Sequence, residues 1–244
     1  MIKGLYTSAS GMLPHIKKQE LSANNLANAS TSGYKKDRVF TRELTKAETR
    51  LASTPTEWAQ PMTDHIYTDF KSGAFNRTDN PLDFAIEGDG FFALQTPDGQ
   101  TLLTRSGSFT ISPEGLLTFP GGAEVMGEGG AIEIGNGRVE VSYAGDVQVD
   151  GFVVGRLVPV TVADLTELEK VGGSMFAVPP GQELVPLEDF TIRQGYIEAS
   201  NVDIVSEMVD MIASYRAYEA NAKAVQSQDS SLEHLFNRVA SRGQ

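Results

Sequence analysis

The spacing of apolar residues divides the 244-residue chain into three zones. From residue 1 to about 30 and from about 201 to about 240, apolar residues recur every three or four positions, which predicts amphipathic helix. The middle alternates apolar and polar residues between frequent turn signals, which predicts antiparallel strands. The sequence therefore predicts an α+β fold with an N-terminal helical segment (1–35), an extended connector (36–64), an antiparallel β-domain (65–195) and a long C-terminal helix (196–244).

The C-terminal zone carries the longest apolar stripe. Its positions alternate steps of four and three over about five heptads, and Asp229 interrupts them. Such a helix is on the order of 55–60 Å long at about 1.5 Å per residue, more than one small domain needs, so we expect it to pack against a partner helix. Asp229 is either an ordinary exposed residue or a register-setting residue that pairs with a Lys, Arg or amide donor of that partner. The stripe comprises Ile204, Met208, Met211, Tyr215, Tyr218, Ala222, Val225, Asp229, Leu232, Phe236 and Val239.

The N-terminal zone has a matching stripe, with Gln19 as its polar exception. Stripes at both ends of one chain indicate a coiled-coil-like core in which the terminal helices pair with each other, with neighbouring subunits, or in both ways. The alternative is two amphipathic helices that pack on a central core. The stripe comprises Ile2, Leu5, Ala9, Met12, Ile16, Gln19, Ala23 and Leu26.

Three local signals refine the helical zones. Ser200, followed three residues later by Asp203, predicts a capping box at the start of the C-terminal helix. Glu219 and Lys223 have the spacing of an ion pair between successive turns. Pro14 removes a backbone hydrogen bond from the N-terminal helix at a cost of about 3 kcal/mol, so we expect a kink, with two shorter helices as the alternative.

The middle zone contains repeated turn signals. Asp98-Gly99, Asn136-Gly137 and Asp150-Gly151 each separate two apolar segments, as in hairpins with type I′ turns. Short strands at this spacing indicate a compact antiparallel sandwich or barrel. The connector that precedes them is polar, and Pro55 and Pro61 favour an extended conformation there.

Composition excludes several classes of function. The formal net charge is −12, so the surface repels phosphate backbones and we expect no nucleic-acid binding. The chain has no cysteine, which removes disulfides, thiolate nucleophiles and cysteine-based zinc sites. No apolar run reaches the roughly 20 residues of a membrane span, and the first ten residues do not resemble a cleaved signal peptide. We therefore expect no membrane insertion, and any export would have to use a route without a cleaved signal.

Motifs that could mark an active site have better structural explanations. Gly88-Asp-Gly90-Phe-Phe-Ala93 has the glycine spacing of a dinucleotide-binding fingerprint, but the residues after it predict a strand and hairpin instead of the required helix. The Gly-rich run 126–137 lacks the Lys-Ser/Thr ending of a phosphate-binding loop. Neighbouring carboxylates, such as those of Asp83, Glu87 and Asp89, are common by chance in a chain with 32 acidic residues. We predict no catalytic, cofactor or metal site, no small-molecule substrate and no enzyme.

Several segments closely resemble one known family. Ala23-Asn-Asn-Leu-Ala-Asn-Ala-Ser-Thr-Ser-Gly-Tyr-Lys35 resembles the N-terminal signature of flagellar rod, hook and hook-associated axial proteins. Gln194-Gly-Tyr-Ile-Glu-Ala-Ser-Asn-Val-Asp203 resembles the C-terminal counterpart of that signature. Segments 81–92 and 104–109 are similar to the β-domain of the hook–rod group. The matching positions of the N-terminal signature are Asn24, Asn25, Leu26, Ala27, Asn28, Thr31, Gly33, Tyr34 and Lys35.

The resemblance implies a structural subunit of the bacterial flagellar basal-body rod, part of the torque-transmitting drive shaft. It also implies assembly with copies of itself and other rod subunits, and export through the flagellar type III apparatus. The short length and Val125-Met-Gly-Glu-Gly-Gly-Ala-Ile-Glu-Ile134 are most like the proximal-rod subunit. We predict subunit contacts on both stripes and at the turn after the first helix, through Ile2, Leu5, Met12, Ile16, Asn24, Asn25, Leu26, Asn28, Gly33, Tyr34, Ile204, Met208, Met211, Tyr215, Tyr218, Val225, Asp229, Leu232 and Phe236.

Two other functions stay open at this point. One is a distal-rod or hook-type axial subunit of the same group. The other is a non-flagellar adhesive or sugar-binding β-domain with accessory helices, which a cluster of exposed aromatic side chains on the β-surface would favour. An enzyme is a more remote alternative that would require a deep pocket with convergent polar groups.

Overall fold

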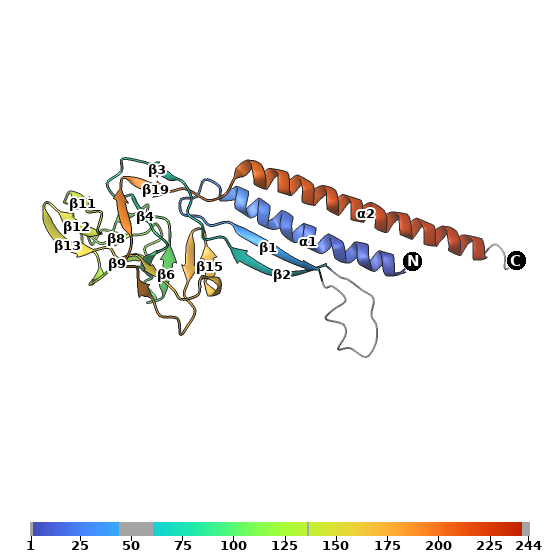
Figure 1. Cartoon of the computed structure of the whole chain (residues 1–244), viewed down its shortest axis with the longest axis horizontal. Helices are drawn as coiled ribbons and strands as arrows, with labels where there is room; N and C mark the ends of the chain where they lie inside the picture. The colour runs from blue at the N-terminus through green and yellow to red at the C-terminus, as the bar shows by residue number, and fades with distance from the viewer. Residues whose placement is uncertain (1, 44–60, 136, 241–244) are drawn as a thin grey trace. The chain divides into compact units, whose positions relative to one another are not determined.

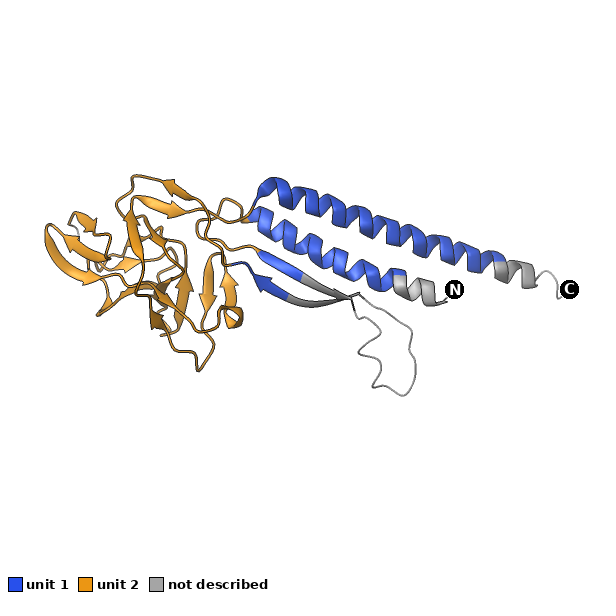
Figure 2. Ribbon diagram, viewed as in Figure 1, with its two compact units in different colours: residues 1–27, 37–69, 203–244 blue, residues 28–36, 70–202 orange. Residues whose placement is uncertain are grey.

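The chain folds into two compact units (Figure 2). The computed structural model describes residues 2–43, 61–135 and 137–240, and within them the side chains of 8–39, 66–135 and 137–234. Unit 1 comprises residues 1–27, 37–69 and 203–244, whereas unit 2 comprises residues 28–36 and 70–202. Neither unit is therefore a single continuous stretch of sequence.

Unit 1 contains the terminal helices α1 (Ile2–Ala27) and α2 (Ile204–Ala240). They lie side by side and antiparallel (Figure 1). Lys18 Nζ is 2.9 Å from Asp210 Oδ1, and a Cβ added to Gly11, earlier in α1, would lie 3.4 Å from Nδ2 of Asn221, later in α2. The predicted helices at both ends of the chain are confirmed, and they contact each other.

α1 is continuous across Pro14, whose side chain is buried. The alternative of two shorter helices is therefore wrong. A proline inside a helix removes one backbone hydrogen bond, and the 26-residue helix persists without it. The kink expected at this position stays a prediction.

α2 begins directly after Asp203, whose Oδ1 accepts a hydrogen bond from Ser206 N at 3.0 Å. Asp203 is therefore the capping residue. The prediction that Ser200 caps the helix is wrong, because Ser200 Oγ accepts a hydrogen bond from Val202 N at 3.3 Å, before the helix begins. The predicted ion pair between Lys223 Nζ and Glu219 Oε1 is confirmed at 2.8 Å.

Unit 1 also contains an antiparallel pair of strands, β1 (Asp37–Glu43) and β2 (Pro61–Thr68). A bulge interrupts their register between Phe40 and Thr41. The sequence analysis placed this region in the extended connector 36–64 and did not foresee the pairing. The two strands are separated by residues 44–60, so no short turn signal joins them. Residues 44–60, which include Pro55, lie outside the described residues.

Unit 2 consists of short strands, and each pairing among its described strands is antiparallel, as predicted. Its largest sheet has the order β15-β16-β6-β5-β9-β8-β7, with β10 paired to β9. The strands of this sheet are β5 (Phe92–Gln95), β6 (Thr101–Thr104), β7 (Thr110–Ile111), β8 (Leu117–Thr118), β9 (Glu124–Gly127), β10 (Gly130–Ala131), β15 (Glu169–Gly172) and β16 (Met175–Ala177).

Unit 2 also contains several smaller sheets. β11, β12 and β13 form a meander, while β14 pairs with β17, β4 with β18, and β3 with β19. A 3-10 helix, η2, covers Leu165–Glu167. The bounds of these strands are β3 (Phe75–Arg77), β4 (Phe84–Glu87), β11 (Val139–Val141), β12 (Asp146–Val149), β13 (Phe152–Arg156), β14 (Val160–Thr161), β17 (Val185–Pro186), β18 (Thr191–Gln194) and β19 (Tyr196–Glu198).

The core of unit 2 lies on both faces of β5. Phe92 and Leu94 belong to one buried cluster, whereas Phe91 and Ala93 belong to another, because successive side chains of a strand point to opposite faces. In the first cluster the rings of Phe92 and Phe109 meet edge to face, with centroids 5.1 Å apart. This burial on two sides explains why the segment Phe91–Leu94 is apolar at consecutive positions.

The three predicted hairpin turns have different outcomes. Asp150 and Gly151 both have positive φ between β12 and β13, which confirms a type I′ hairpin. Asp98-Gly99 joins β5 to β6 as predicted, but Gly99 alone of the two has positive φ, and its N–H donates to Thr96 O at 2.9 Å, so the turn is not type I′. The Asn136-Gly137 hairpin is wrong, since β11 pairs with β12 instead; Asn136 itself lies outside the described residues.

Candidate functional site

The segments that carry the family resemblance meet around one carboxylate, that of Glu198. Glu198 is the last residue of β19 and lies opposite Phe75 of β3. The turn that follows α1, residues 32–36, and Arg105, which follows β6, both contact Glu198. All of these residues belong to unit 2. Residues distant in sequence thus form one site.

Lys35 and Glu198 form a buried ion pair. Lys35 Nζ lies 2.6 Å from Glu198 Oε1, and their side chains are 0% and 1% exposed. Lys35 Nζ also donates to Lys71 O at 2.8 Å, and Glu198 Oε1 accepts from Gly73 N at 2.9 Å and from Ser72 Oγ at 3.2 Å. Burying an ion costs several kcal/mol unless it is paired and hydrogen-bonded, so these contacts allow both charges to lie in the interior.

Arg105 brings a second cation to the same carboxylate. Its NH1 is 3.5 Å from Glu198 Oε2, its NH2 donates to Gly88 O at 2.7 Å, and its guanidinium lies 5.2 Å from the centroid of the Phe91 ring. Burial lowers the pKa of Arg105, while the carboxylates of Glu198 and Asp89 act in the opposite direction. The guanidinium nevertheless stays charged, because an arginine side chain loses its proton only far above neutral pH. Two buried cations therefore share the Glu198 carboxylate.

The backbone of the turn after α1 fits closely against this ion pair. Gly33 N donates to Glu198 O at 2.8 Å, and Ser32 Oγ donates to the same oxygen at 3.1 Å. Gly33 has φ +66°, and a Cβ at this position would lie 2.2 Å from Ser106 N. Glycine is therefore required here both for its backbone conformation and for the available space.

Lys170 and Asn201 hold the same turn from two further elements. Lys170 Nζ lies 4.2 Å from the centroid of the buried Tyr34 ring and donates to Lys35 O at 2.7 Å. Asn201 Oδ1 accepts from Lys36 N at 2.8 Å, and Asn201 N donates to Tyr34 O at 3.3 Å. Asn201 therefore binds the turn at two points, through its side-chain oxygen and through its backbone N–H.

In unit 1, the side chain of Asn25, near the end of α1, binds the backbone of a later residue. Its Nδ2 donates to Asp37 O at 2.9 Å, and its Oδ1 accepts from Asp37 N at 3.0 Å. Asn25 is 2% exposed, so both backbone groups of Asp37 are satisfied by a buried side chain. The signature asparagine at this position therefore fixes the path of the chain into β1.

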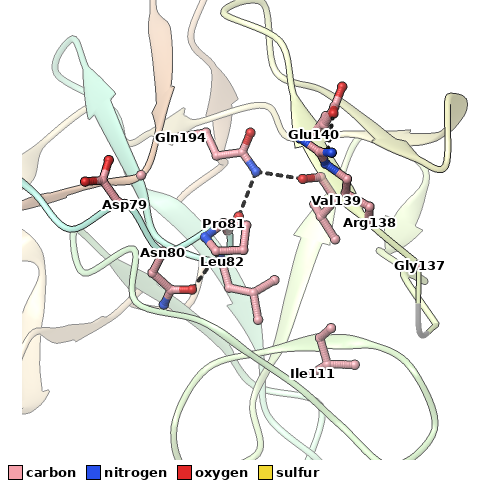
Figure 3. Close-up of a pocket in the computed structure, with 11 residues that line it drawn as sticks. Asp79, Asn80, Pro81, Leu82, Ile111, Gly137, Arg138, Val139, Glu140 and Gln194 are labelled. Atoms are coloured by element: carbon pink, nitrogen blue, oxygen red, sulfur yellow. Dashed lines mark hydrogen bonds and ion pairs between the residues drawn. The ribbon is translucent and has the colours of Figure 1, made fainter.

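A groove elsewhere in unit 2 has no reaction chemistry assembled in it (Figure 3). It has a volume of about 520 Å³ and is crossed by Gln194, whose Nε2 donates to Pro81 O at 2.8 Å and to Val139 O at 2.9 Å. Gln194 Oε1 accepts from Val141 N at 3.1 Å. These polar groups are used by the fold itself, whereas an active site needs polar groups that converge on a substrate.

The remaining candidate motifs are also part of the fold. The Gly88–Ala93 segment runs from a turn into β5, and no helix follows it, as the sequence predicted. Among the described residues, no group of His, Asp and Glu side chains is arranged to hold a metal ion. None of the described helices combines the length and apolarity needed to cross a membrane.

The first turns of α2 carry an unusual distribution of side chains. Val205 is 71% exposed, Val209 is 60% exposed and Ile212 is 55% exposed, while Glu207 and Ser214 are buried. A surface helix ordinarily buries its apolar face and exposes its polar one. Here the arrangement is reversed, and the exposed apolar face of α2 comprises Ile204, Val205, Met208, Val209, Ile212 and Tyr215.

The residues predicted to make subunit contacts occupy different environments. The buried ones, Asn25, Gly33 and Tyr34, are held by contacts within the chain. The exposed ones are Ile16, Asn24, Ile204, Met208, Tyr215 and Asp229. The half-buried ones are Met12, Leu26, Asn28, Met211, Tyr218, Val225 and Leu232, and the side chains of Ile2, Leu5 and Phe236 lie outside the described residues.

The sequence analysis did not single out Glu198, Arg105 or Asn201. They lie within the segments that carry the resemblance. The sequence analysis identified those segments but did not predict the role of these three residues. Charged side chains are mostly exposed, and a single sequence gives no sign of which carboxylate among 32 is buried.

Comparison with known proteins matches three parts of the chain to flagellar families. Residues 5–35 match the family described as "Flagella basal body rod protein", residues 85–153 match "Flagellar hook protein FlgE/F/G D1 domain", and residues 193–238 match "Flagellar basal body rod FlgEFG protein C-terminal". Lys35, Arg105 and Glu198 lie one in each of these matches. The three family segments thus meet at the buried ion pair.

Several curated proteins are similar over most of their length. The flagellar basal-body rod protein FlgF of Caulobacter vibrioides is 35% identical, over 91% of this chain and 92% of its own. FlgG of Buchnera aphidicola subsp. Acyrthosiphon pisum is 30% identical, over 96% and 99% respectively. The flagellar hook-basal body complex protein FlhO of Bacillus subtilis is 28% identical, over 98% and 99%.

The molecule combines two terminal helices in contact, an antiparallel β-rich unit and a buried ion pair inside that unit. The chain belongs to the family of flagellar basal-body rod proteins, and it is a structural subunit of the bacterial flagellar rod.

Proposed function

We propose that this subunit polymerises through its two terminal helices, with copies of itself and with other rod subunits, to form part of the torque-transmitting drive shaft. The observation that carries the proposal is the exposed apolar face of α2. Six apolar side chains from Ile204 to Tyr215 are at least 45% exposed, although buried positions in the same stretch hold Glu207 and Ser214. A neighbouring subunit would remove this face from water, and burial of apolar surface drives association.

α1 offers a second surface of the same kind. Leu13 is 66% exposed and Ile16 is 38% exposed. Exposed residues of α1 continue this line in alternating steps of four and three, the spacing of a helical seam. The line comprises Ala9, Leu13, Ile16, Glu20, Ala23 and Ala27.

These surfaces support the view that each terminal helix pairs twice, once within the chain and once with a neighbour in a coiled-coil-like core. Within the chain, the pair includes Lys18–Asp210 and the contact of Gly11 with Asn221. The apolar residues that stay exposed on the two helices are available for other subunits. An assembly of identical head-to-tail contacts that do not close produces a tube or filament, as a rod requires.

For the position within the rod, we propose the proximal segment. The support is the resemblance of residues 125–134 and of the chain length to the proximal-rod subunit. A distal-rod or hook-type position is the alternative, because relatives named for both FlgF and FlgG match over nearly the whole chain. We also propose delivery by the flagellar type III export apparatus, as the same resemblance implies.

The non-flagellar adhesive alternative gains no support from the β-surface. Phe152 is 78% exposed and Tyr143 is 75% exposed, but they lie beyond opposite ends of β12. Exposed aromatic residues that bind a sugar need to gather in one place. These two do not form the cluster that such a function would require.

The proposal is tested by placing one negative charge on, or beside, the exposed apolar face. Ile212→Asp should leave the chain folded but abolish incorporation into the rod and swimming motility, because an aspartate cannot be buried in an apolar contact without a partner. Ala213→Asp is the matched control, since Ala213 is exposed on α2 but lies outside that face. Circular dichroism checks folding, and electron microscopy of purified basal bodies checks rod length.

Normal rods and normal motility in Ile212→Asp would contradict assembly through this face. Electron microscopy of basal bodies from a strain that lacks the gene separates the two positions. A rod that is absent or stops near the inner membrane supports the proximal position. A short rod that ends further out indicates a distal subunit.

A further inference from the structure

We infer that Glu198 acts as a latch for the turn segment 32–36, which packs onto the rest of unit 2 only after β19 has brought the Glu198 carboxylate into place. This inference concerns the folding of the single chain and does not depend on the rod assignment. It rests on two observations. The turn is bonded to Glu198 and Asn201, whereas Glu198 also has partners that lie outside the turn.

Every residue of the turn segment is bonded to Glu198 or to Asn201. Ser32 Oγ and Gly33 N donate to Glu198 O, and Lys35 Nζ donates to Glu198 Oε1. Asn201 N donates to Tyr34 O, and Lys36 N donates to Asn201 Oδ1. A stretch of five residues is therefore held, residue by residue, by two residues that lie more than 160 positions later in the chain.

Glu198 has supports that do not involve the turn. Its strand β19 pairs with β3 over three positions, from Tyr196 opposite Arg77 to Glu198 opposite Phe75. Its carboxylate accepts from Gly73 N and Ser72 Oγ, and Arg105 NH1 lies 3.5 Å from it. β19 can therefore take its place, with its carboxylate hydrogen-bonded, before the turn arrives.

The reverse order is unfavourable. If the turn closed before β19, the ammonium of Lys35 would be buried without the carboxylate that lies 2.6 Å from it, in a region that also holds the buried guanidinium of Arg105. Removing one partner of a buried ion pair is strongly destabilising, since it leaves an uncompensated charge in the interior. Gly33 and Ser32 would also lose the carbonyl that accepts their hydrogen bonds. We therefore expect β19 to pack first and the turn to pack afterwards.

The consequence for the molecule is that the N-terminal signature turn stays detached until almost the entire chain has been made available. β19 lies more than 160 residues after the turn, as the separation of 163 between Lys35 and Glu198 shows. The latch thus couples the placement of the turn to the presence of the C-terminal signature segment.

Hydrogen–deuterium exchange with mass spectrometry on the full-length chain tests the latch. Glu198→Gln removes the charge and keeps the shape of the side chain, and Glu169→Gln, at an exposed position of β15, is the matched control. We expect the protection of the amides of 32–36 to fall in Glu198→Gln by at least about tenfold more than that of β5 and β6, because local opening is measured separately from global unfolding. Glu169→Gln should exchange like the wild type.

Lys35→Met supplies the reciprocal measurement. We expect it to leave the protection of β19 and β3 within about threefold of wild type, because Gly73, Ser72 and Arg105 still support the carboxylate. The latch is overturned if Glu198→Gln leaves 32–36 protected, if it raises exchange in β5 and β6 as much as in 32–36, or if it unfolds the chain. It is equally overturned if Lys35→Met opens β19 as much as Glu198→Gln opens the turn.

Discussion

Lys35 and Glu198 are separated by 163 residues in sequence, yet the Lys35 ammonium lies 2.6 Å from the Glu198 carboxylate in the interior of unit 2. Each residue comes from one of the two signature segments of the rod family, which lie near opposite ends of the chain. Arg105, from the segment between them, lies against the same carboxylate. Part of what the family signatures encode is therefore a contact inside the subunit.

The energetic coupling of Lys35 to Glu198 can be measured with a double-mutant cycle. Glu198→Leu should lower the free energy of unfolding by about 3–5 kcal/mol, because it leaves two buried cations without their carboxylate. The double variant Lys35→Met, Glu198→Leu should recover at least about 1 kcal/mol of this loss, since one of the unpaired charges is gone. Urea unfolding of the full chain gives these values.

An exposed ion pair provides the control for this cycle. Arg77 Nε and Asp79 Oδ1 are also 2.6 Å apart, but their side chains are 68% and 71% exposed. Solvent screens such a pair, so Arg77→Met should change stability far less than the loss of the buried Glu198 carboxylate. Equal effects at the two pairs would show that burial does not determine the strength of the Lys35–Glu198 contact.

Gly33 should tolerate no side chain. Gly33→Ala should cost well over about 1 kcal/mol, because alanine is strained at φ +66° and its Cβ would meet the backbone of Ser106. Gly99→Ala is the control: its φ is +79°, but nothing lies within 4 Å of an added Cβ, so it should cost only about 1 kcal/mol. Chemical unfolding of both variants separates backbone strain from steric conflict, and similar losses would contradict the close packing.

The start of α2 distinguishes two possible capping residues. Asp203→Ala should destabilise the helix by about 1 kcal/mol, because Ser206 N loses its side-chain acceptor. Ser200→Ala should have a smaller effect, since Ser200 bonds to Val202 before the helix begins. Thermal unfolding followed by circular dichroism at 222 nm compares them, and a larger loss in Ser200→Ala would restore the capping box predicted from sequence.

The ion pair on α2 should be visible in a pH titration. A hydrogen bond from Lys223, and then its positive charge, lower the pKa of Glu219 below the usual carboxyl value. A lowered pKa means that the pair supports the helix above the ordinary pKa, and that this support disappears as the pH falls through the lowered value. Carboxyl ¹³C NMR should show the Glu219 pKa rising toward its usual value in Lys223→Met. Arg216→Met, the control, should shift the Glu219 pKa much less, because the charge of Arg216 acts on Glu219 more weakly than Lys223 does.

The sequence predicted the type of each long element better than the face it presents. The stripe on α2 is real, but its early members Ile204, Met208 and Tyr215 are exposed, whereas Val225 and Leu232 are half-buried. A strict seven-residue repeat drifts by about 20° per heptad on a straight helix, so a stripe that begins on one side moves toward another. Periodicity alone therefore could not show which part of the stripe faces α1.

The features that the sequence did not reveal depend on contacts between distant residues. β1 and β2 pair across residues 44–60, so no turn signal announces their sheet. Asp203 caps α2 where Ser200 also satisfied the motif, and only the position of the first helical residue distinguishes them. Nothing in Tyr34-Lys35-Lys36 shows that the middle residue is fully buried beside Glu198. Local patterns specify elements, whereas these features require the tertiary structure.

The pairing of α1 with α2 also has a kinetic consequence. Lys18 and Asp210 are 192 residues apart, whereas the hairpins of unit 2 join near neighbours such as Val149 and Phe152. Closing a long loop costs more configurational entropy than closing a short one, and folds that depend on distant contacts form more slowly. We therefore expect the hairpins to form within the earliest folding events and the helix pair to be the rate-limiting closure. Until the helices pair, the exposed surfaces of α1 and α2 lie at the two separate ends of the chain.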